Sequence, residues 1–403
     1  MFPNAITLAS IASLLVSMAS ASSDANLKET DDQGEFSWRF LEKASNEYKD
    51  NIVVSSYSVR RLIASLLRVT EQSDEVTNEL QNVLNLSIDS KISQRYNEQM
   101  ERLTGSGDLI KGSLLAVFRV NKLSDDLQAE ATRYGLKVVQ TEDKTTALTA
   151  INNAINEMSK GKVEEFTKGY DFRSLSMMDY IEYNGLWKYN FNGDPTVCNF
   201  FTDASTTTLT NFITAETMFN YGSFENLNLK ALELPLPETS ALRCVLLLPL
   251  NKKSLQSVMQ NFDHNNFREI LKGLSSVQTS VTIPKFVMQL TTLAKNVLET
   301  MGLHKPFTNA IFNVYQNGQE NLDEIVQKSK FTMNGNGTTN PRSVFSYSMM
   351  QQQQFFANQP FIYVIFEKVQ SIPILMGHYE RPTEILPEGV QQSEAFRCQL
   401  SPF

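Results

Sequence analysis

Apolar residues recur at two different spacings along this chain, and the change of spacing divides it into two halves. In the first half, the apolar residues from Phe36 to Ala44 return at helical spacing, which predicts a helix that ends near Asp50. The same periodicity predicts further helices at 59–69, 74–86, 92–103, 125–134 and 146–158. Ser58 and Ser73 precede two of these helices, so we expect both side chains to act as N-caps.

In the second half, short apolar runs bounded by turn residues predict strands. Together with an early strand at 51–55, the predicted strands are 114–120, 177–187, 229–236, 243–250, 280–286, 361–367 and 372–379. Three helices interrupt them, at 254–262, 267–274 and 293–301. Many of the strand runs are apolar on both faces, as in covered sheets. Helices first and strands later indicate an α+β fold with large sheets, and no repeat or linker marks a domain boundary.

One segment fits neither pattern. Residues 333–359 hold Gly, Asn, Ser and a run of four Gln, with no periodicity for a helix or a strand. A loop of about 20 or more irregular residues is uncommon inside a compact domain, and such loops are usually functional or disordered. We therefore expect an exposed loop with a function of its own.

Charge and the first residues limit the partners and the compartment. The net charge of −8 leaves no basic field for a phosphate backbone, so we expect no nucleic acid partner. Residues 1–21 hold an apolar stretch that ends in Ala19-Ser20-Ala21, which predicts a signal peptide and a secreted mature chain from Ser22. The stretch is too short and too rich in serine to span a membrane, which takes about 20 apolar residues, so no membrane partner is expected.

No pattern nominates an enzyme, a metal site or a cofactor. The three histidines, His264, His304 and His378, lack metal-ligand spacing, and the chain has no nucleophile elbow or phosphate-binding glycine loop. Three cysteines, Cys198, Cys244 and Cys398, leave at least one thiol unpaired. A bridge between two of them and burial as small apolar side chains both stay open. Once secretion is accepted, the sequons at Asn85 and Asn336 predict glycosylation.

Four ordered blocks carry a family resemblance. Residues 355–382, FFANQPFIYVIFEKVQSIPILMGHYERP, resemble the C-terminal signature of the serpins, and its fixed positions fall on Phe356, Ala357, Asn358, Pro360, Phe361, Gly377 and Pro382. The other three blocks are NIVVSSYSV at 51–59, YNGLWKYNF at 183–191, and the pair VTIPKF and LETMGLHKPF at 281–286 and 298–307. The resemblance spans roughly residues 36–382.

The resemblance implies one domain at 22–382 with three β-sheets, about eight or nine helices and an exposed reactive-centre loop near 335–356. The tail at 383–403 stays unexplained as a C-terminal extension. In inhibitory serpins a target serine protease cleaves the loop, and the loop then inserts as a new strand in the largest sheet before the acyl-enzyme is hydrolysed. Gly337 and Thr338 match the start of the inserting segment, whereas Thr339, Asn340, Pro341 and Arg342 depart from its run of small residues.

The hinge sequence predicts slow insertion. If Thr338 faces inward, alternation turns Asn340 and Arg342 inward as well and Pro341 outward. A proline removes a ladder hydrogen bond from a central strand, and a buried unpaired arginine costs several kcal/mol more. Each ~1.4 kcal/mol added to the insertion barrier slows it tenfold while hydrolysis of the acyl-enzyme continues. We therefore expect a protease substrate with weak or absent covalent trapping.

Other positions follow from the resemblance. The sheet-opening region matches at Ser55, Ser58 and Trp187, while Asp179 stands where asparagine is usual and Gln327 where histidine is. Asp179 and Gln327 are expected to hydrogen-bond each other, and Trp187 to pack structurally. Counting from Gly337 places the scissile region at Tyr347, Met349, Met350 and Gln351.

The absence of Arg and Lys in the scissile region favours an extracellular chymotrypsin-like partner. The segment KISQRYNEQMER mixes both charges, so no strong heparin site is predicted, and we expect a monomer. Two alternatives remain: a fully functional suicide inhibitor of a serine protease, and a non-inhibitory extracellular carrier or binding protein on the same scaffold.

Overall fold

The computed structural model of the chain describes residues 28, 30–70, 73–86, 92–118, 122–168, 170, 173–250, 255–260, 262–309, 311–315, 318–340, 353–384, 386, 390–393 and 398. The expected leader, residues 1–21, lies outside the described residues. No described helix is both long enough and apolar enough to cross a membrane.

Helices dominate the first half of the chain, as the apolar periodicity predicts. A helix over residues 30–47 comes first, and the following ones are α2 (Ser56–Leu66), α3 (Asp74–Leu84), α4 (Ile92–Thr104), α5 (Asp125–Arg133) and α6 (Lys144–Met158). Four shorter helices come later: α7 (Leu255–Met259), α8 (His264–Gly273), α9 (Ala294–Thr300) and α10 (Lys305–Thr308). Ser73 caps α3 as expected, because its side chain accepts the backbone N–H of Val76.

The N-cap of α2 is Ser55, and the expectation that Ser58 caps this helix is wrong. The Ser55 side chain accepts the backbone N–H of Ser58, and α2 therefore begins at Ser56, one turn earlier than predicted. The apolar periodicity misplaced this start because Ser56, Tyr57 and Ser58 are all buried although two of them are polar.

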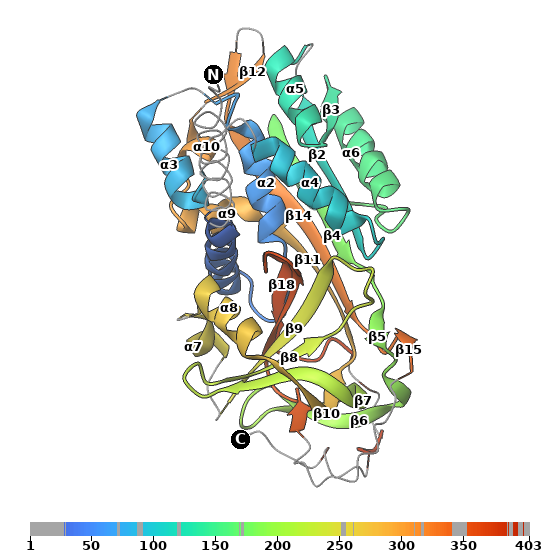
Figure 1. Cartoon of the computed structure of the whole chain (residues 1–403). Coiled ribbons are helices and arrows are strands. Elements are labelled where there is room, and N and C mark those ends of the chain that lie inside the picture. Colours follow the sequence, from blue (N-terminus) through green and yellow to red (C-terminus); the bar gives the residue numbers. More distant parts are fainter. Residues whose placement is uncertain are drawn as a thin grey trace, which may run out of the picture.

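The five-stranded sheet crosses the centre of the molecule (Figure 1). Its strands, in spatial order, are β11 (Phe286–Leu293), β14 (Leu322–Met333), β4 (Leu175–Tyr183), β2 (Leu109–Phe118) and β3 (Lys137–Thr141). Helix α6 packs on one face of this sheet and α2 on the other, so apolar residues alternate between two core clusters along β4 and β14. Strands β11, β14 and β3 were not predicted, because their sequences carry polar residues at several positions.

A nine-stranded sheet forms the other half of the fold. Its spatial order is β1 (Ile52–Val54), β18 (Pro373–Tyr379), β17 (Phe361–Glu367), β9 (Leu242–Pro249), β8 (Leu229–Leu234), β7 (Thr207–Phe224), β10 (Ser275–Pro284) and β16 (Gln353–Phe356), with β6 (Asn192–Phe201) beside β7. The long strand β7 pairs with β6 over 207–214, with β10 over 212–221 and with β8 over 220–224, so it joins two smaller sheets. With the five-stranded sheet, this gives the three large sheets of the expected α+β fold.

Two short strand pairs complete the described structure. One joins β12 (Phe312–Tyr315) to β13 (Gly318–Glu320), and the other joins β5 (Trp187–Tyr189) to β15 (Gly337–Thr339).

The C-terminal extension is bound to β6 and β7. Cys198 of β6 forms a disulfide with Cys398, whereas Cys244 is a free, buried thiol. The hydroxyl of Thr210, the register partner of Cys198 on β7, donates to the carbonyl of Glu384. The backbone N–H of Ser393 donates to the carbonyl of Val197 at 2.8 Å. The tail thus crosses the β6–β7 pair and covers part of the exposed edge of β6.

Candidate functional site

The start of the irregular segment forms β15 and lies beside β5 (Figure 1). The two strands are parallel, with Gly337 opposite Trp187 and Thr339 opposite Tyr189. The backbone N–H of Asn190 donates to the carbonyl of Thr339 at 2.7 Å. The hinge residues Gly337, Thr338 and Thr339 are therefore held outside the five-stranded sheet.

Side chains on both strands strengthen this attachment. The amide oxygen of Asn190 accepts the backbone N–H of Gly337 at 2.7 Å, and its amide nitrogen donates to the side chain of Asn340 at 2.9 Å. The hydroxyls of Thr338 and Thr339 both donate to the carbonyl of Lys188, at 3.2 and 2.5 Å. The Lys188 ammonium bonds Glu238 at 2.8 Å, and this hydrogen bond raises the pKa of Lys188.

Trp187 closes the junction between β5 and the end of β14. Its indole is buried, with 2% of its surface exposed, and its N–H donates to the carbonyl of Asn334 at 2.8 Å. The Trp187 backbone N–H also donates to the carbonyl of Asn336 at 3.0 Å. The Trp187 side chain is therefore packed in the core, and Trp187 also fixes the backbone that leads into the hinge.

The five-stranded sheet is closed beside the hinge, where β4 leads into β5 and β14 leads into β15. Strands β4 and β14 are direct parallel neighbours, paired from Leu322 opposite Leu175 to Phe331 opposite Tyr183. We call the line between these two strands the seam. Because β4 and β14 are hydrogen-bonded along this length, no described residue forms a strand between them.

A buried polar cluster lies on the seam, beneath the N-terminal end of α2. The side chains of Asp179 and Gln327 are opposite one another across the seam, and the Gln327 amide donates to the Asp179 carboxylate at 3.3 Å. Gln327 also donates to the carbonyl of Ser55 at 2.9 Å and accepts the Ser55 N–H at 2.7 Å. Ser58 is buried nearby, and its hydroxyl has no hydrogen-bond partner among the described residues.

The remaining residues expected in the loop are not described. Pro341 and Arg342 of the hinge, and Tyr347, Met349, Met350 and Gln351 of the scissile region, all lie outside the described residues. The described chain resumes at Gln353, where β16 begins and pairs in parallel with β10.

The two sequons differ in their surroundings. Asn336 is exposed on the turn between β14 and β15, and its backbone N–H bonds the side chain of Asn334. Asn85 is half-buried at the end of α3 in a left-handed conformation with φ of 49°, and its carbonyl accepts from Arg60. Of the two sequon asparagines, Asn336 is therefore the more accessible.

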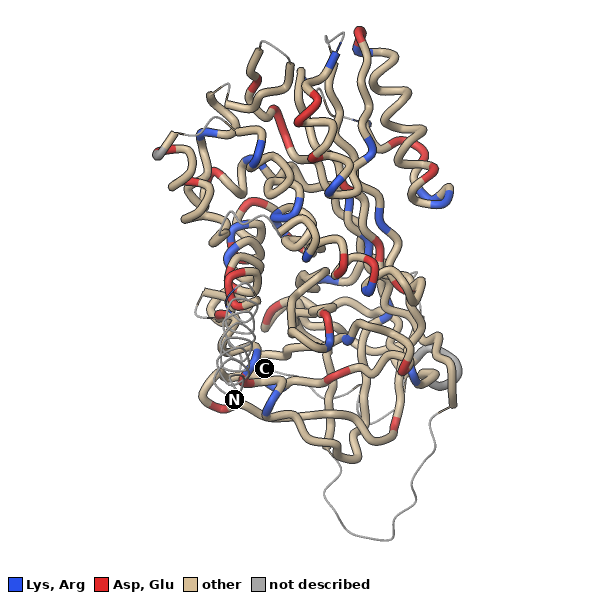
Figure 2. Tube along the Cα trace, turned by 45° about the horizontal axis from the view of Figure 1, so that its top comes forward, with Lys and Arg blue, Asp and Glu red and all other residues tan. Residues whose placement is uncertain are grey.

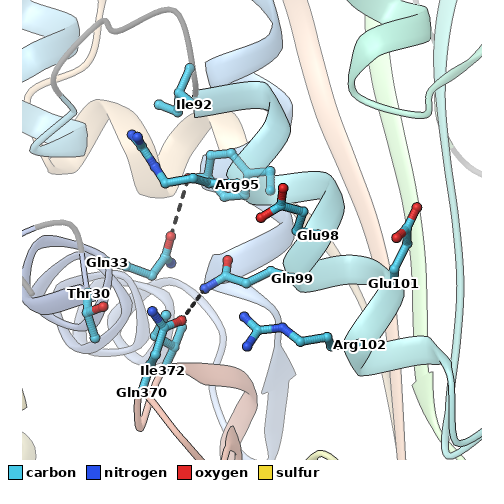
Figure 3. Close-up of a pocket in the computed structure, with 11 residues that line it drawn as sticks. Thr30, Gln33, Ile92, Arg95, Glu98, Gln99, Glu101, Arg102, Gln370 and Ile372 are labelled. Carbon is cyan, nitrogen blue, oxygen red and sulfur yellow. Dashed lines mark hydrogen bonds between the residues drawn. The ribbon is translucent and has the colours of Figure 1, made fainter. Parts of the chain in front are cut away.

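A cavity of about 550 Å³ separates α4 from the helix at 30–47 (Figure 3). Gln99 and Arg102 of α4 point into it, toward Gln370, and the Gln99 amide donates to Gln370 at 2.7 Å. Glu98 and Arg95 also line it, so both charges are present. This volume lies in the range of small-molecule sites, and it is where the carrier alternative would place a ligand.

Among the described residues, no group of three or more His, Cys, Asp or Glu comes together as a metal site. Figure 2 shows positive and negative residues interspersed along the tube. The sequence of α4 likewise carries both charges.

The sequence did not reveal the residues that hydrogen-bond to the hinge or to the seam from other parts of the chain. Asn190, Ser113 and Arg61 belong to these contacts, and so does the disulfide of the tail. Two adjacent arginines within the largely apolar run 59–69 were a usable signal, because a buried arginine requires polar partners.

Comparisons with known proteins agree with this architecture. A family model described as "Serpin (serine protease inhibitor)" matches residues 31–382. Two curated relatives, each named "FXa-directed anticoagulant", come from Aedes albopictus and Aedes aegypti. Each is 28% identical to this chain, and the alignments cover 92% of this chain and 92% of each relative. A crystal structure of maspin superposes with a TM-score of 0.80 at 18% identity, over 89% of this chain and 100% of that one.

The family model spans most of the chain, and the α+β fold with its large sheets is the one that the four sequence blocks imply. The chain therefore belongs to the serpin family of serine protease inhibitors.

Proposed function

We propose that this chain is a secreted serpin that offers its loop to an extracellular chymotrypsin-like serine protease and traps that protease weakly or not at all. The observation that carries the proposal is the position of the hinge. Residues 337–339 are hydrogen-bonded to β5 beside a seam that is closed from Leu322 to Phe331. A cut loop must leave β5 and open this seam before the acyl-enzyme is hydrolysed.

The hinge sequence makes that step slow. Asn340 is the last described hinge residue, and it is held by the side chain of Asn190 at 2.9 Å. Pro341 and Arg342 follow. In an inserted strand the proline supplies no ladder N–H and the arginine brings a charge to a sheet that is covered on both faces. Both effects raise the insertion barrier and leave hydrolysis of the acyl-enzyme unchanged.

The tip of the loop supports the class of protease. Residues 343–352, SVFSYSMMQQ, contain no Arg or Lys, and Tyr347, Met349 and Met350 suit a pocket that takes large apolar side chains. The names of the two Aedes relatives refer to FXa, and that target belongs to those proteins.

A working suicide inhibitor is the second candidate, and two observations favour it. Gly337 and Thr338 match the start of an inserting segment. The mosquito relatives, which align with nearly the whole length of the chain, are named as anticoagulants. In this case partial insertion tolerates Pro341 and Arg342.

One experiment separates the two candidates. The full chain is incubated with chymotrypsin and with pancreatic elastase, and the products are separated on denaturing gels under reducing conditions. We expect cleavage within 341–352 without a covalent complex. An SDS-stable complex at the summed mass of the two proteins contradicts weak trapping and supports the working inhibitor.

A matched variant tests the role of the hinge. Pro341→Ala combined with Arg342→Ala should raise the melting temperature of the loop-cleaved protein above that of the intact one, because a cleaved loop that inserts adds a strand. The unchanged chain should show no such rise. If the double variant also shows none, the hinge residues are not what prevents insertion.

A further inference from the structure

One row of buried polar side chains crosses four strands of the five-stranded sheet at a single level. Thr292 of β11 is the register partner of Gln327, Gln327 is the partner of Asp179, and Asp179 is the partner of Ser113 on β2. The exposed fraction is 3% for Ser113 and 0% for the other three. A carboxylate at this depth needs compensation, because burial strongly disfavours an unpaired charge.

The compensating charge comes from α2. Arg61 is 1% exposed, and its guanidinium donates to the Ser113 hydroxyl at 2.6 Å and to the carbonyl of Tyr134 at 2.5 Å. The Ser113 hydroxyl in turn donates to the Asp179 carboxylate at 2.6 Å. One shared hydroxyl therefore links Arg61 to Asp179.

Lys111 is the other cation that faces this cluster, from β2. Burial, with Arg61 close by, lowers the pKa of Lys111 well below its usual range. Burial disfavours a charged ammonium at Lys111, and the cation that is hydrogen-bonded into the cluster is the guanidinium of Arg61.

Helix α2 therefore contacts both sides of the seam. At its N-terminal end, Ser55 holds Gln327 of β14 through two hydrogen bonds. Six residues later, Arg61 holds Ser113 of β2. Six residues of helix rise about 9 Å, which matches two strand spacings of about 4.8 Å from β14 across β4 to β2.

We propose that Arg61 is a positioning residue for opening the seam: it compensates the buried charge of Asp179 and lets α2 brace β14 against β4 and β2. A strand that enters the seam moves β14 away from β2 by one more spacing of about 4.8 Å. The Gln327–Asp179 hydrogen bond then breaks, and α2 cannot keep both Ser55 on β14 and Arg61 on β2. Arg61 thus makes the seam harder to open.

The inference builds on the proposed function, in which seam opening limits trapping, but it is tested without a protease. Hydrogen exchange of the backbone amides in 177–183 and 325–331 is measured by mass spectrometry on the intact full chain, relative to exchange in β17 and β18. Arg61→Met should speed exchange at the seam at least tenfold. Arg60→Met is the matched control, because Arg60 is equally buried on α2 but donates to Leu84, Gln33 and Tyr96, away from the seam.

The charge pairing gives a second, sharper readout. Asp179→Asn should speed seam exchange in the unchanged background but slow it in the Arg61→Met background, because it then removes an uncompensated carboxylate. It should not rescue Arg60→Met. Equal seam exchange in Arg61→Met and Arg60→Met, or additive effects of Asp179→Asn and Arg61→Met, would overturn the proposal.

Two variants cover a failure of Arg61→Met to fold. Ser113→Ala removes the hydroxyl between the charges, and Arg61→Lys puts an ammonium where burial disfavours its charge, so both variants should speed seam exchange. If neither variant changes seam exchange, Arg61 does not act on the seam. These outcomes leave the protease experiment untouched, and a covalent complex there would leave the role of Arg61 standing.

Discussion

Gly337 lies so close to the backbone of Tyr189 that a Cβ atom built on it would stand 2.2 Å from the Tyr189 carbonyl carbon. No real Cβ contact is that short, and the obstacle is backbone, which cannot rotate away. The glycine at the start of the hinge is therefore required by the pairing of β15 with β5.

Gly337→Ala should detach β15 from β5. We expect a loss of about 1–3 kcal/mol in the free energy of unfolding and faster proteolysis at residues 337–340. Urea unfolding and limited proteolysis measure the two effects. Gly335→Ala is the control, because its Cβ would meet the Phe191 carbonyl oxygen at an ordinary 3.5 Å. Equal behaviour of the two variants would contradict the close approach.

Ser55→Ala and Ser58→Ala should differ although both serines are buried in the same turn. The Ser55 hydroxyl donates to the Ile374 carbonyl at 2.6 Å and accepts the Ser58 N–H, so its loss should cost about 1–2 kcal/mol. The Ser58 hydroxyl has no partner among the described residues, so removing it should be neutral or stabilising. Urea unfolding of both variants tests the difference, and a larger loss in Ser58→Ala would refute it.

Acid should destabilise the fold through two buried histidines. Burial lowers the pKa of His264 and of His378 to about 4 from the usual 6.5. Because the folded pKa lies below the unfolded one, their contribution is present above pH 6.5 and is lost as the pH falls toward 4. The loss is about 3 kcal/mol for each histidine.

His264→Leu should flatten this acid dependence, because both ring nitrogens of His264 lack a partner among the described residues. The free energy of unfolding is measured between pH 7.5 and 4, with His304→Gln, at an exposed site, as the control. Glu324 opposes the trend: burial raises its pKa to about 7, so its contribution is lost as the pH rises from 4.5 to 7. An unchanged acid slope in His264→Leu would show that His264 is not buried as a neutral group.

Cys398→Ser should lower stability without changing the seam. The bridge joins residues 200 positions apart, and closing so long a loop is worth about 5 kcal/mol in the chain-entropy description. The melting temperature should fall in this variant and in the wild type after reduction. Seam exchange in 325–331 should stay unchanged, and reduction should have no further effect on Cys398→Ser.

The apolar pattern predicted those elements whose side chains face the core on both sides. Strands β17 and β9 carry nearly continuous apolar runs, and they lie where the sequence placed them. Strand β7 was missed, because its exposed face is rich in Thr and Asn and its 18 residues show no long apolar run. Strand β14 was missed because Gln327 and Ser329 are polar residues buried in the core, which hydrophobicity alone places outside.

The candidate site was predictable only where it matches a family pattern. The hinge glycine, Trp187 and the pair Asp179 and Gln327 came from ordered motifs, and Gln327 and Asp179 do hydrogen-bond each other. Arg61 and Asn190 lie on other segments, more than 100 positions from Asp179 and Gly337, and only the fold brings them together. Periodicity carries no information on such pairings.

The bridge between Cys198 and Cys398 also decides what a cut loop becomes. A cleavage anywhere in 341–352 places the two cysteines on different fragments, so the product stays a single covalent molecule with four chain ends. Denaturant alone cannot separate its two pieces, and the C-terminal peptide appears only after a thiol reductant is added. A nicked molecule in an oxidising fluid would therefore keep the mass of the intact one, apart from one added water.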